Sequence, residues 1–234
     1  MGALRYPAPA GSAEGLVVLL PGLGDDPGSF AANGFVETIQ SLDPKLEVVA
    51  VDAHLGYYRS ATIVPRLHED VVVPALSRGD RVWIVGISMG GLGAAAYASE
   101  HPETVAGLVL LAPYMGSDEV VEEIRRAGGL ASWQPQDAGA DVDASRRRYV
   151  DLWRWYRGYA TEPDHRPKLF LGHGDADRLA PANELVAAVL PPDRRLTGSG
   201  GHAWVVWKPL FEELAARAFA PATRDHAEPS SRRQ

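Results

Sequence analysis

Residues 81–91 read Arg-Val-Trp-Ile-Val-Gly-Ile-Ser-Met-Gly-Gly, and this stretch decides the fold. The apolar run over 81–85 lacks polar alternation, which is typical of a strand buried on both faces of a parallel sheet. It is followed by a G-x-S-x-G sequence centred on Ser88 and then by small residues with a helical pattern over 89–100. A buried strand, a sharp turn that carries a serine, and a helix therefore follow one another. The flanking glycines leave the turn free of side chains.

The same strand-and-helix rhythm extends in both directions from this stretch. Further apolar runs predict strands, and helical patterns predict helices between them. The strands are expected at 16–20, 48–51, 105–111, 168–171 and 195–197, and the helices near 29–42, 62–77, 183–190 and 208–219. This alternation predicts an α/β fold with an open, mostly parallel, doubly wound sheet and helices on both faces. Ligands of such sheets bind at the carboxyl ends of the strands.

The rest of the chain divides around one α/β domain over 15–220. Residues 1–14 are rich in Pro, Ala, Gly and Ser and are expected to be a flexible lead-in. The segment 115–167 is too long for a simple crossover, and it predicts two helices, at 117–126 and about 144–160, that form a small lid. Residues 221–234 are polar and lack aromatic side chains, so we expect a disordered tail.

Composition excludes several classes of function. A net charge of −7 argues against a nucleic-acid-binding surface, which is basic. The chain has no cysteine, which excludes disulfides, thiolate metal sites and cysteine nucleophiles. No apolar stretch approaches the roughly 18 residues of a membrane span, and the first residues lack the apolar run of a signal peptide. We therefore expect a cytoplasmic protein with no membrane span.

The motif around Ser88 resembles the nucleophile elbow of the α/β-hydrolase superfamily, of the serine esterase and lipase type, and the resemblance covers about residues 15–219. It implies that Ser88 is the nucleophile and that an acid and then a histidine follow it along the chain. Gly174-Asp175-Ala176-Asp177 resembles the family's G-x-x-D loop and implies Asp177 as the acid. Asp175 remains the alternative, because either carboxylate lies at the end of the same loop.

The histidine that completes this order is His202. It lies in a glycine loop before the last helix, in a G-G-H-x-W-x-x-W pattern that includes Trp204 and Trp207. This pattern resembles the putative-esterase branch of the superfamily. Together the three residues imply a Ser-His-Asp triad, with His202 as the base and Asp177 as the group that orients it.

An oxyanion hole is the next requirement of such chemistry, because backbone N–H groups must stabilise the charge that forms on the carbonyl oxygen. The resemblance implies the N–H of Met89 as one donor and the N–H of Leu23, in Pro21-Gly22-Leu23-Gly24, as the other. The family pattern at this second loop is H-G-x-G, and Pro21 replaces its histidine. The donor itself is a backbone group and is unaffected by that replacement.

The implied activity is a two-step hydrolysis of small carboxylic esters, with an acyl-enzyme intermediate and with no metal or cofactor. Aromatic residues near the expected site favour small esters with apolar acyl or aryl groups over long lipids. The candidates for substrate binding are Tyr57 after the second strand, Trp133, Trp153 and Tyr156 in the lid, and Trp204 beside His202. The alternative for these aromatic residues is packing against the sheet.

Two other functions stay open at this point. One is a related chemistry on the same fold, such as a thioesterase or an acyltransferase. The other is a non-catalytic protein that binds a small molecule, because a fold alone does not fix function. The sequence does not distinguish a monomer from a homodimer.

Overall fold

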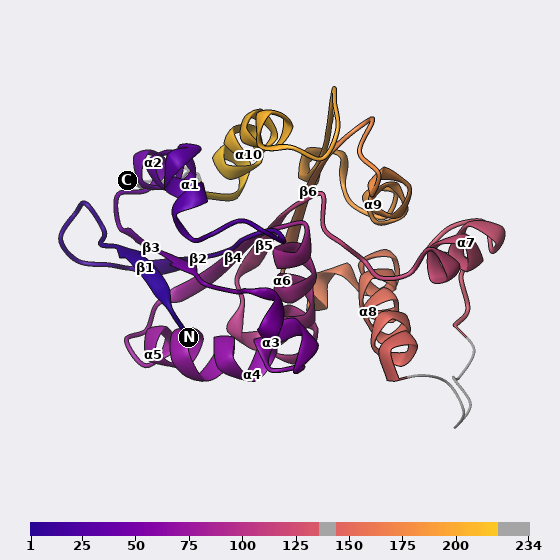
Figure 1. Cartoon of the computed structure of the whole chain (residues 1–234), viewed down its shortest axis with the longest axis horizontal. Coiled ribbons are helices and arrows are strands. Elements are labelled where there is room, and N and C mark those ends of the chain that lie inside the picture. The colour runs from indigo at the N-terminus through magenta and orange to yellow at the C-terminus, as the bar shows by residue number, and fades with distance from the viewer. Residues whose placement is uncertain (136–143, 220–234) are drawn as a thin grey trace, which may run out of the picture.

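In the computed structural model, which describes residues 1–135 and 144–219, seven strands form one sheet in the order β1-β3-β2-β4-β5-β6-β7. Neighbouring strands are parallel, except that β1 is antiparallel to β3. The strands are β1 (Ala3–Tyr6), β2 (Gly15–Leu20), β3 (Leu46–Val51), β4 (Arg81–Ile87), β5 (Gly107–Leu111), β6 (Lys168–Gly174) and β7 (Arg195–Gly198). This is the open, mostly parallel sheet with flanking helices that the sequence predicted (Figure 1).

Helices connect the strands. They are α1 (Gly28–Ala32), α2 (Phe35–Leu42), α3 (Leu55–Arg59), α4 (Ile63–Leu67), α5 (Val73–Leu76), α6 (Met89–Glu100), α7 (Asp118–Arg126), α8 (Ala144–Thr161), α9 (Ala180–Ala187) and α10 (Trp204–Phe219). A π-helical turn over His68–Val72 joins α4 to α5. No helix within the described ranges is long and apolar enough to cross a membrane.

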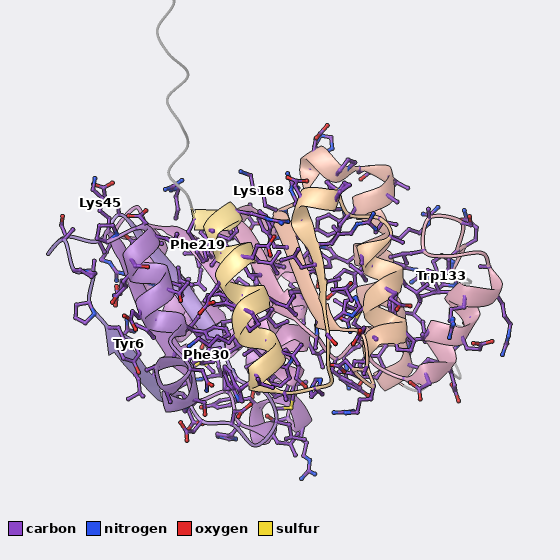
Figure 2. The ribbon with its side chains drawn as sticks, turned by 90° about the horizontal axis from the view of Figure 1, so that it is seen from above. Tyr6, Phe30, Lys45, Trp133, Lys168 and Phe219 are labelled. Atoms are coloured by element: carbon purple, nitrogen blue, oxygen red, sulfur yellow. The ribbon has the colours of Figure 1, made fainter. Side chains whose placement is uncertain are left out.

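The sheet separates two hydrophobic cores, because successive residues of a strand point to opposite faces. Val17 and Leu19 of β2 face a core that contains Phe35 of α2 and Phe211 of α10. Leu16 and Val18 face the other core, which is covered by α4, α6 and α8. Helices α2 and α10 lie side by side over their face (Figure 2). Both faces of the central strands are thus buried, which explains their continuous apolar runs.

Two predicted helices are interrupted in the structure. The pattern over 29–42 forms α1 and α2, and the break falls at Gly34, whose φ of 80° is a left-handed conformation that glycine adopts without steric cost. The pattern over 62–77 forms α4, the π-helical turn and α5. In contrast, α6 has the bounds that the sequence predicted.

The first residues differ from the expectation of a flexible lead-in. Residues 3–6 form β1, which pairs with β3 at the edge of the sheet. This strand is mostly exposed and only four residues long, so it lacks the apolar run that identifies the central strands. The predicted tail at 221–234 lies outside the described residues.

The segment between β5 and β6 contains the two predicted helices, α7 and α8. Gly128 and Gly129 follow α7 with φ values of 84° and 108°, and this left-handed backbone conformation ends the helix. Helix α8 packs beside α6, the helix that follows Ser88, whereas α7 lies farther out beside α9 (Figure 1). The insert therefore reaches the carboxyl ends of the strands chiefly through α8.

Candidate active site

Ser88 occupies a strained turn between β4 and α6. Its φ of 52° and ψ of −114° are unusual for a residue with a side chain, and such a conformation costs on the order of 1–3 kcal/mol. Hydrogen bonds hold the turn in place. The Ser88 N–H donates to the Leu111 carbonyl over 3.0 Å, and the Ser88 carbonyl accepts the Tyr114 N–H over 2.9 Å. The end of β5 therefore fixes the backbone of Ser88.

The glycines of the motif are required by close contacts of the backbone. A Cβ atom on Gly90 would lie 2.0 Å from the Leu20 carbonyl oxygen, and one on Gly86 would lie 2.5 Å from the Gly90 carbonyl oxygen. Both distances are shorter than any real Cβ contact. The absence of side chains at these two positions lets α6 start directly against the ends of β2 and β4.

Three side chains that are distant in sequence form one hydrogen-bonded chain. The Ser88 Oγ lies 2.9 Å from His202 Nε2, and His202 Nδ1 lies 2.8 Å from Asp177 Oδ2. The Asp177 side chain is fully buried, and that of His202 is 19% exposed. A serine hydroxyl, an imidazole and a buried carboxylate in this order can activate the hydroxyl by proton transfer.

The two aspartates of the loop after β6 make different contacts. Asp177 Oδ1 accepts the N–H of Leu179 over 2.8 Å while its Oδ2 lies against His202. Asp175 Oδ1 accepts the N–H of Gly200 over 2.8 Å. Asp177 therefore contacts the imidazole itself, whereas Asp175 supports the backbone of the loop that carries it.

The imidazole of His202 also has a firm apolar support. The ring of Trp207 meets it edge to face, with the ring centroids 4.8 Å apart. Trp207 is buried at the start of α10, so the first turn of that helix limits the movement of the imidazole. This contact explains the second tryptophan of the G-G-H-x-W-x-x-W pattern.

The two residues expected to supply the oxyanion hole both border Ser88. Leu23 and Met89 line the same pocket as the serine. Met89 is the first residue of α6, and N–H groups in the first turn of a helix have no acceptor within the helix. The Leu23 side chain is 64% exposed and points away from the core.

The pocket at Ser88 has a volume of about 470 Å³. It is lined by Leu23, Leu55, Tyr58, Arg59, Ser88, Met89, Leu92, Tyr114, Arg148, Tyr149 and Arg178. Burial raises the pKa of Tyr58 and of Tyr114 above the ordinary value for tyrosine. Both phenols therefore stay neutral at physiological pH and keep their hydroxyl protons.

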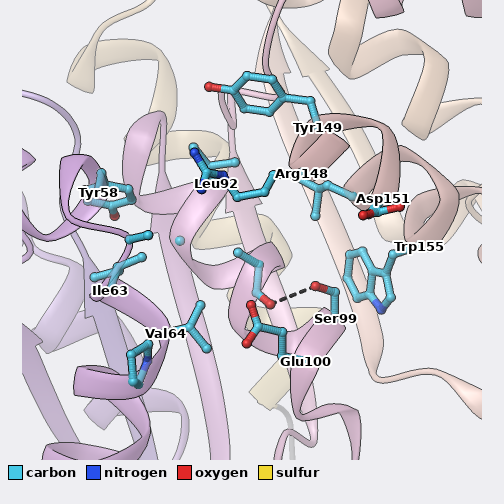
Figure 3. A pocket seen from close by; sticks show the side chains of 15 residues that line it. Tyr58, Ile63, Val64, Leu92, Ser99, Glu100, Arg148, Tyr149, Asp151 and Trp155 are labelled. Carbon is cyan, nitrogen blue, oxygen red and sulfur yellow. Dashed lines mark hydrogen bonds between the residues drawn. The ribbon is translucent and has the colours of Figure 1, made fainter. Parts of the chain in front are cut away.

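A second pocket continues from the first, between α4, α6 and α8 (Figure 3). Its volume is about 540 Å³. Four residues line both pockets, namely Tyr58, Leu92, Arg148 and Tyr149. Apolar side chains such as Ile63, Val64, Leu152 and Trp155 line its middle, and Ser99 and Glu100 lie at its far end. The two pockets therefore adjoin each other beside α6.

The structure places the aromatic candidates for substrate binding outside the lining of the Ser88 pocket. Trp133 and Trp153 are buried, and their indole N–H groups donate to Glu123 Oε1 over 2.8 Å and to the Met115 carbonyl over 3.1 Å. Tyr156 is also fully buried, against Trp153 and Trp155. These side chains pack in the hydrophobic core, which was the alternative explanation for these aromatic residues.

The remaining two candidates also have structural contacts. Trp204 packs edge to face against Phe30 and Phe35 and donates its N–H to Asp25. Tyr57 lies beside His54, with the ring centroids 4.5 Å apart, while its neighbour Tyr58 lines the pocket. The pocket is thus lined by Tyr58 and not by Tyr57, the residue expected from the sequence.

Sequence reasoning missed the basic part of the pocket lining. Arg59, Arg148 and Arg178 come from α3, α8 and the loop after β6. Arg178 directly follows Asp177, and this adjacency was the one available signal. The other two approach Ser88 only through the packing of α3 and α8, and no local pattern reports that packing.

Comparisons with known proteins agree with this architecture. A family model described as the alpha/beta hydrolase fold matches residues 15–152, which is more than half of the chain. No curated protein matches the sequence. Several hundred solved chains resemble the structure.

Three of these solved structures illustrate the resemblance. An S-formylglutathione hydrolase from Staphylococcus aureus is 18% identical, with 89% of this chain and 82% of that chain covered and a TM-score of 0.61. A ferulic acid esterase is 19% identical, with 89% and 86% covered and a TM-score of 0.61. A monoacylglycerol lipase from Paleococcus ferrophilus is 17% identical, with 93% and 98% covered and a TM-score of 0.57.

At these identities the structural likeness establishes the fold and leaves the substrate open. The match of the family model extends from β2 through the Ser88 turn into α8. On the evidence of this match and of the sheet, the chain belongs to the α/β-hydrolase fold family.

Proposed function

We propose that this protein is a serine hydrolase that cleaves carboxylic esters, with Ser88 as nucleophile, His202 as base and Asp177 as the acid that orients His202. The observation that carries the proposal is the hydrogen-bonded chain from Asp177 through His202 to Ser88, over distances of 2.8 and 2.9 Å. The strained turn at Ser88 and the pocket in front of it support the same interpretation.

The first half of the reaction forms an acyl-enzyme. The Ser88 Oγ attacks the ester carbonyl carbon while His202 Nε2 takes the hydroxyl proton. The carbonyl oxygen becomes negative, and the N–H groups of Leu23 and Met89 stabilise it. The bond between carbon and the alcohol oxygen then breaks, and the protonated His202 returns its proton to the leaving alcohol.

The second half frees the acid. Water loses a proton to His202 as its oxygen attacks the acyl-enzyme, and the proton passes to Ser88 Oγ when the acyl bond breaks. Asp177 accepts a hydrogen bond from the Nδ1–H of His202 throughout, so Nε2 is left as the basic nitrogen. In this cycle the nucleophile, the base, the acid that orients it and the oxyanion donors all belong to the chain itself.

The substrate that fits best is a small ester with an apolar or aryl group. Leu55, Leu92 and Tyr114 provide apolar surface beside Ser88, and the second pocket offers further apolar surface. The similar structures include a ferulic acid esterase and a monoacylglycerol lipase. This likeness supports ester hydrolysis by this chain as part of the proposal.

Ester turnover by purified variants tests the proposal. We expect the wild-type protein to hydrolyse 4-nitrophenyl butyrate and Ser88→Ala to lose about 10³-fold or more of kcat, because triad members act as a unit. Ser77→Ala is a matched control, since its hydroxyl only donates to the Val73 carbonyl. Equal rates for wild type and Ser88→Ala would refute the proposal. Faster cleavage of the matching butyryl thioester would indicate a thioesterase instead.

A further inference from the structure

Arginines from three separate segments meet at the pocket of Ser88. Arg59 ends α3, Arg148 lies on α8, and Arg178 follows Asp177. Among the described residues, the lining of this pocket includes no aspartate or glutamate. The whole chain carries a net charge of −7, so this concentration of positive charge contrasts with the composition of the protein.

Two of these arginines have no acidic partner among the residues that the structure describes. Within the described ranges, neither the Arg59 nor the Arg178 guanidinium forms an ion pair with a carboxylate, and both side chains are exposed. Other arginines do form ion pairs. Arg66 pairs with Asp70, and Arg78 pairs with Asp80. Arg59 and Arg178 thus present guanidinium groups that no carboxylate of the described residues pairs with.

The third arginine extends over the junction of the two pockets. Figure 3 shows the Arg148 side chain reaching from α8 towards Leu92 and Tyr58, the residues that line both pockets. Tyr114 and Tyr149 lie beside it with their rings at 90°. Burial keeps the Tyr114 phenol protonated by raising its pKa, so hydroxyl donors lie next to the guanidinium groups.

We propose that Arg59, Arg148 and Arg178, here called the arginine rim, bind an oxyanion that the ester substrate carries beside the scissile bond. This rests on the function proposed above and narrows it to esters with a carboxylate, sulfonate or phosphate group. A guanidinium offers paired N–H donors that match the oxygens of such groups, and charge-assisted hydrogen bonds are stronger than neutral ones. The apolar part of the same substrate then lies against Leu92 or in the second pocket.

Within the pocket, the positive charge of the arginine rim outweighs the net negative charge of the whole protein. At physiological salt, interactions between exposed charges are screened beyond about 8 to 10 Å, so an anion in the pocket responds chiefly to the rim. The direction in which kcat/KM changes with salt therefore distinguishes the two effects. Attraction by the rim makes kcat/KM for an anionic ester fall as salt is added, whereas repulsion by the net charge would make it rise.

A pair of aryl acetates isolates the charge of the substrate. 4-Acetoxybenzoate is anionic, and its methyl ester is neutral with nearly the same shape. After division by the spontaneous hydrolysis rate of each ester, we expect wild-type kcat/KM to be about tenfold higher for the anion. 4-Acetoxybenzenesulfonate then shows whether the rim prefers a planar carboxylate, and preference for either anion supports the proposal.

Variants assign the preference to the rim. We expect Arg59→Gln combined with Arg178→Gln to abolish the preference for the anionic ester and to flatten its salt dependence. Arg147→Gln is the matched control, because Arg147 neighbours Arg148 on α8, is exposed and does not line the pocket. Equal kcat/KM for the charged and neutral esters in the wild type, or equal effects of the double variant and Arg147→Gln, would overturn the proposal.

A binding measurement separates this proposal from the proposed function. Calorimetric titration of Ser88→Ala with 4-acetoxybenzoate does not depend on turnover. Binding that the two rim substitutions weaken by about tenfold supports the anion site even if the wild type hydrolyses no ester. Hydrolysis of both esters at the same corrected rate, with no binding preference, would instead retain the esterase and refute the anion site.

Discussion

The Asp25 carboxylate accepts the indole N–H of Trp204 over 3.0 Å and so joins the loop after β2 to the start of α10, between residues that are 179 positions apart. Asp25 belongs to the loop after β2 that carries Leu23, and Trp204 follows His202 by two residues. The proposed oxyanion donor and the proposed base are therefore linked by one hydrogen bond. Packing of the Trp204 ring on Phe30 and Phe35 keeps the indole in place for that bond.

We predict that Trp204→Phe lowers kcat by about tenfold with little change in KM, because it removes the hydrogen bond to a charged acceptor and retains the aromatic packing. Asp25→Ala is expected to have the same effect, and the double variant no more than either single one, since both break the same link. Steady-state kinetics on 4-nitrophenyl butyrate measure this. Loss of stability at unchanged kcat would show that the link is only structural.

The two aspartates of the loop after β6 should differ strongly in their effect on catalysis. We expect Asp177→Asn to lower kcat by about 10³- to 10⁴-fold, because an amide favours the wrong tautomer of His202. Asp175→Asn keeps an acceptor for the Gly200 N–H, so we expect a loss of less than about tenfold. A larger loss for Asp175→Asn than for Asp177→Asn would exchange the two assignments.

The close approach at Gly90 predicts a large effect on stability. Gly90→Ala places a Cβ atom 2.0 Å from the Leu20 carbonyl oxygen, and β2 and α6 must separate to admit it. We expect a loss of more than about 3 kcal/mol in the free energy of unfolding. Gly79→Ala is the matched comparison, because position 79 has a φ of 85° and open space around it. There we expect about 1–2 kcal/mol. Urea unfolding at neutral pH compares the two, and equal losses would contradict the steric explanation.

The second pocket predicts a preference for the length of the apolar group. Ala96 faces this pocket from α6, and Ala96→Phe fills part of it. We expect the ratio of kcat/KM for 4-nitrophenyl octanoate over 4-nitrophenyl acetate to fall about tenfold or more, because each methylene that loses its burial costs about 0.8 kcal/mol. Ala160→Phe, at an exposed position of α8, is the control. An unchanged ratio in Ala96→Phe would show that the acyl chain takes another path.

Much of the fold was predictable because the central strands are buried on both faces. The apolar runs at 16–20, 48–51 and 81–85 correspond to β2, β3 and β4. The edge strand β1 and the short helix α3 were missed, since neither has a continuous apolar run or a long helical period. Gly34 divided a predicted helix through its backbone conformation, which the hydrophobic pattern does not report.

The candidate site also has one part that the sequence predicts and another that it does not. The order of Ser88, Asp177 and His202 along the chain was readable, because each lies in a glycine-rich loop after a strand, and the structure brings the three side chains into contact. The residues that line the pocket could not be predicted from the sequence. Trp153 has the spacing of a helix face that packs, whereas Trp133 lies between α7 and α8. The indole N–H groups of both find partners inside the insert. Arg59 and Arg148 reach the pocket only through tertiary packing.

The most direct test of the central claim is intact-mass analysis after treatment with a fluorophosphonate, which labels an activated serine. The account predicts one adduct on the folded wild-type protein, none on Ser88→Ala and greatly slowed labelling of His202→Gln, because the base that activates Ser88 is missing. Ser77→Ala serves as the control and should be labelled like the wild type. Absence of any adduct on the folded wild type, or equal labelling of Ser88→Ala, would contradict the proposed triad.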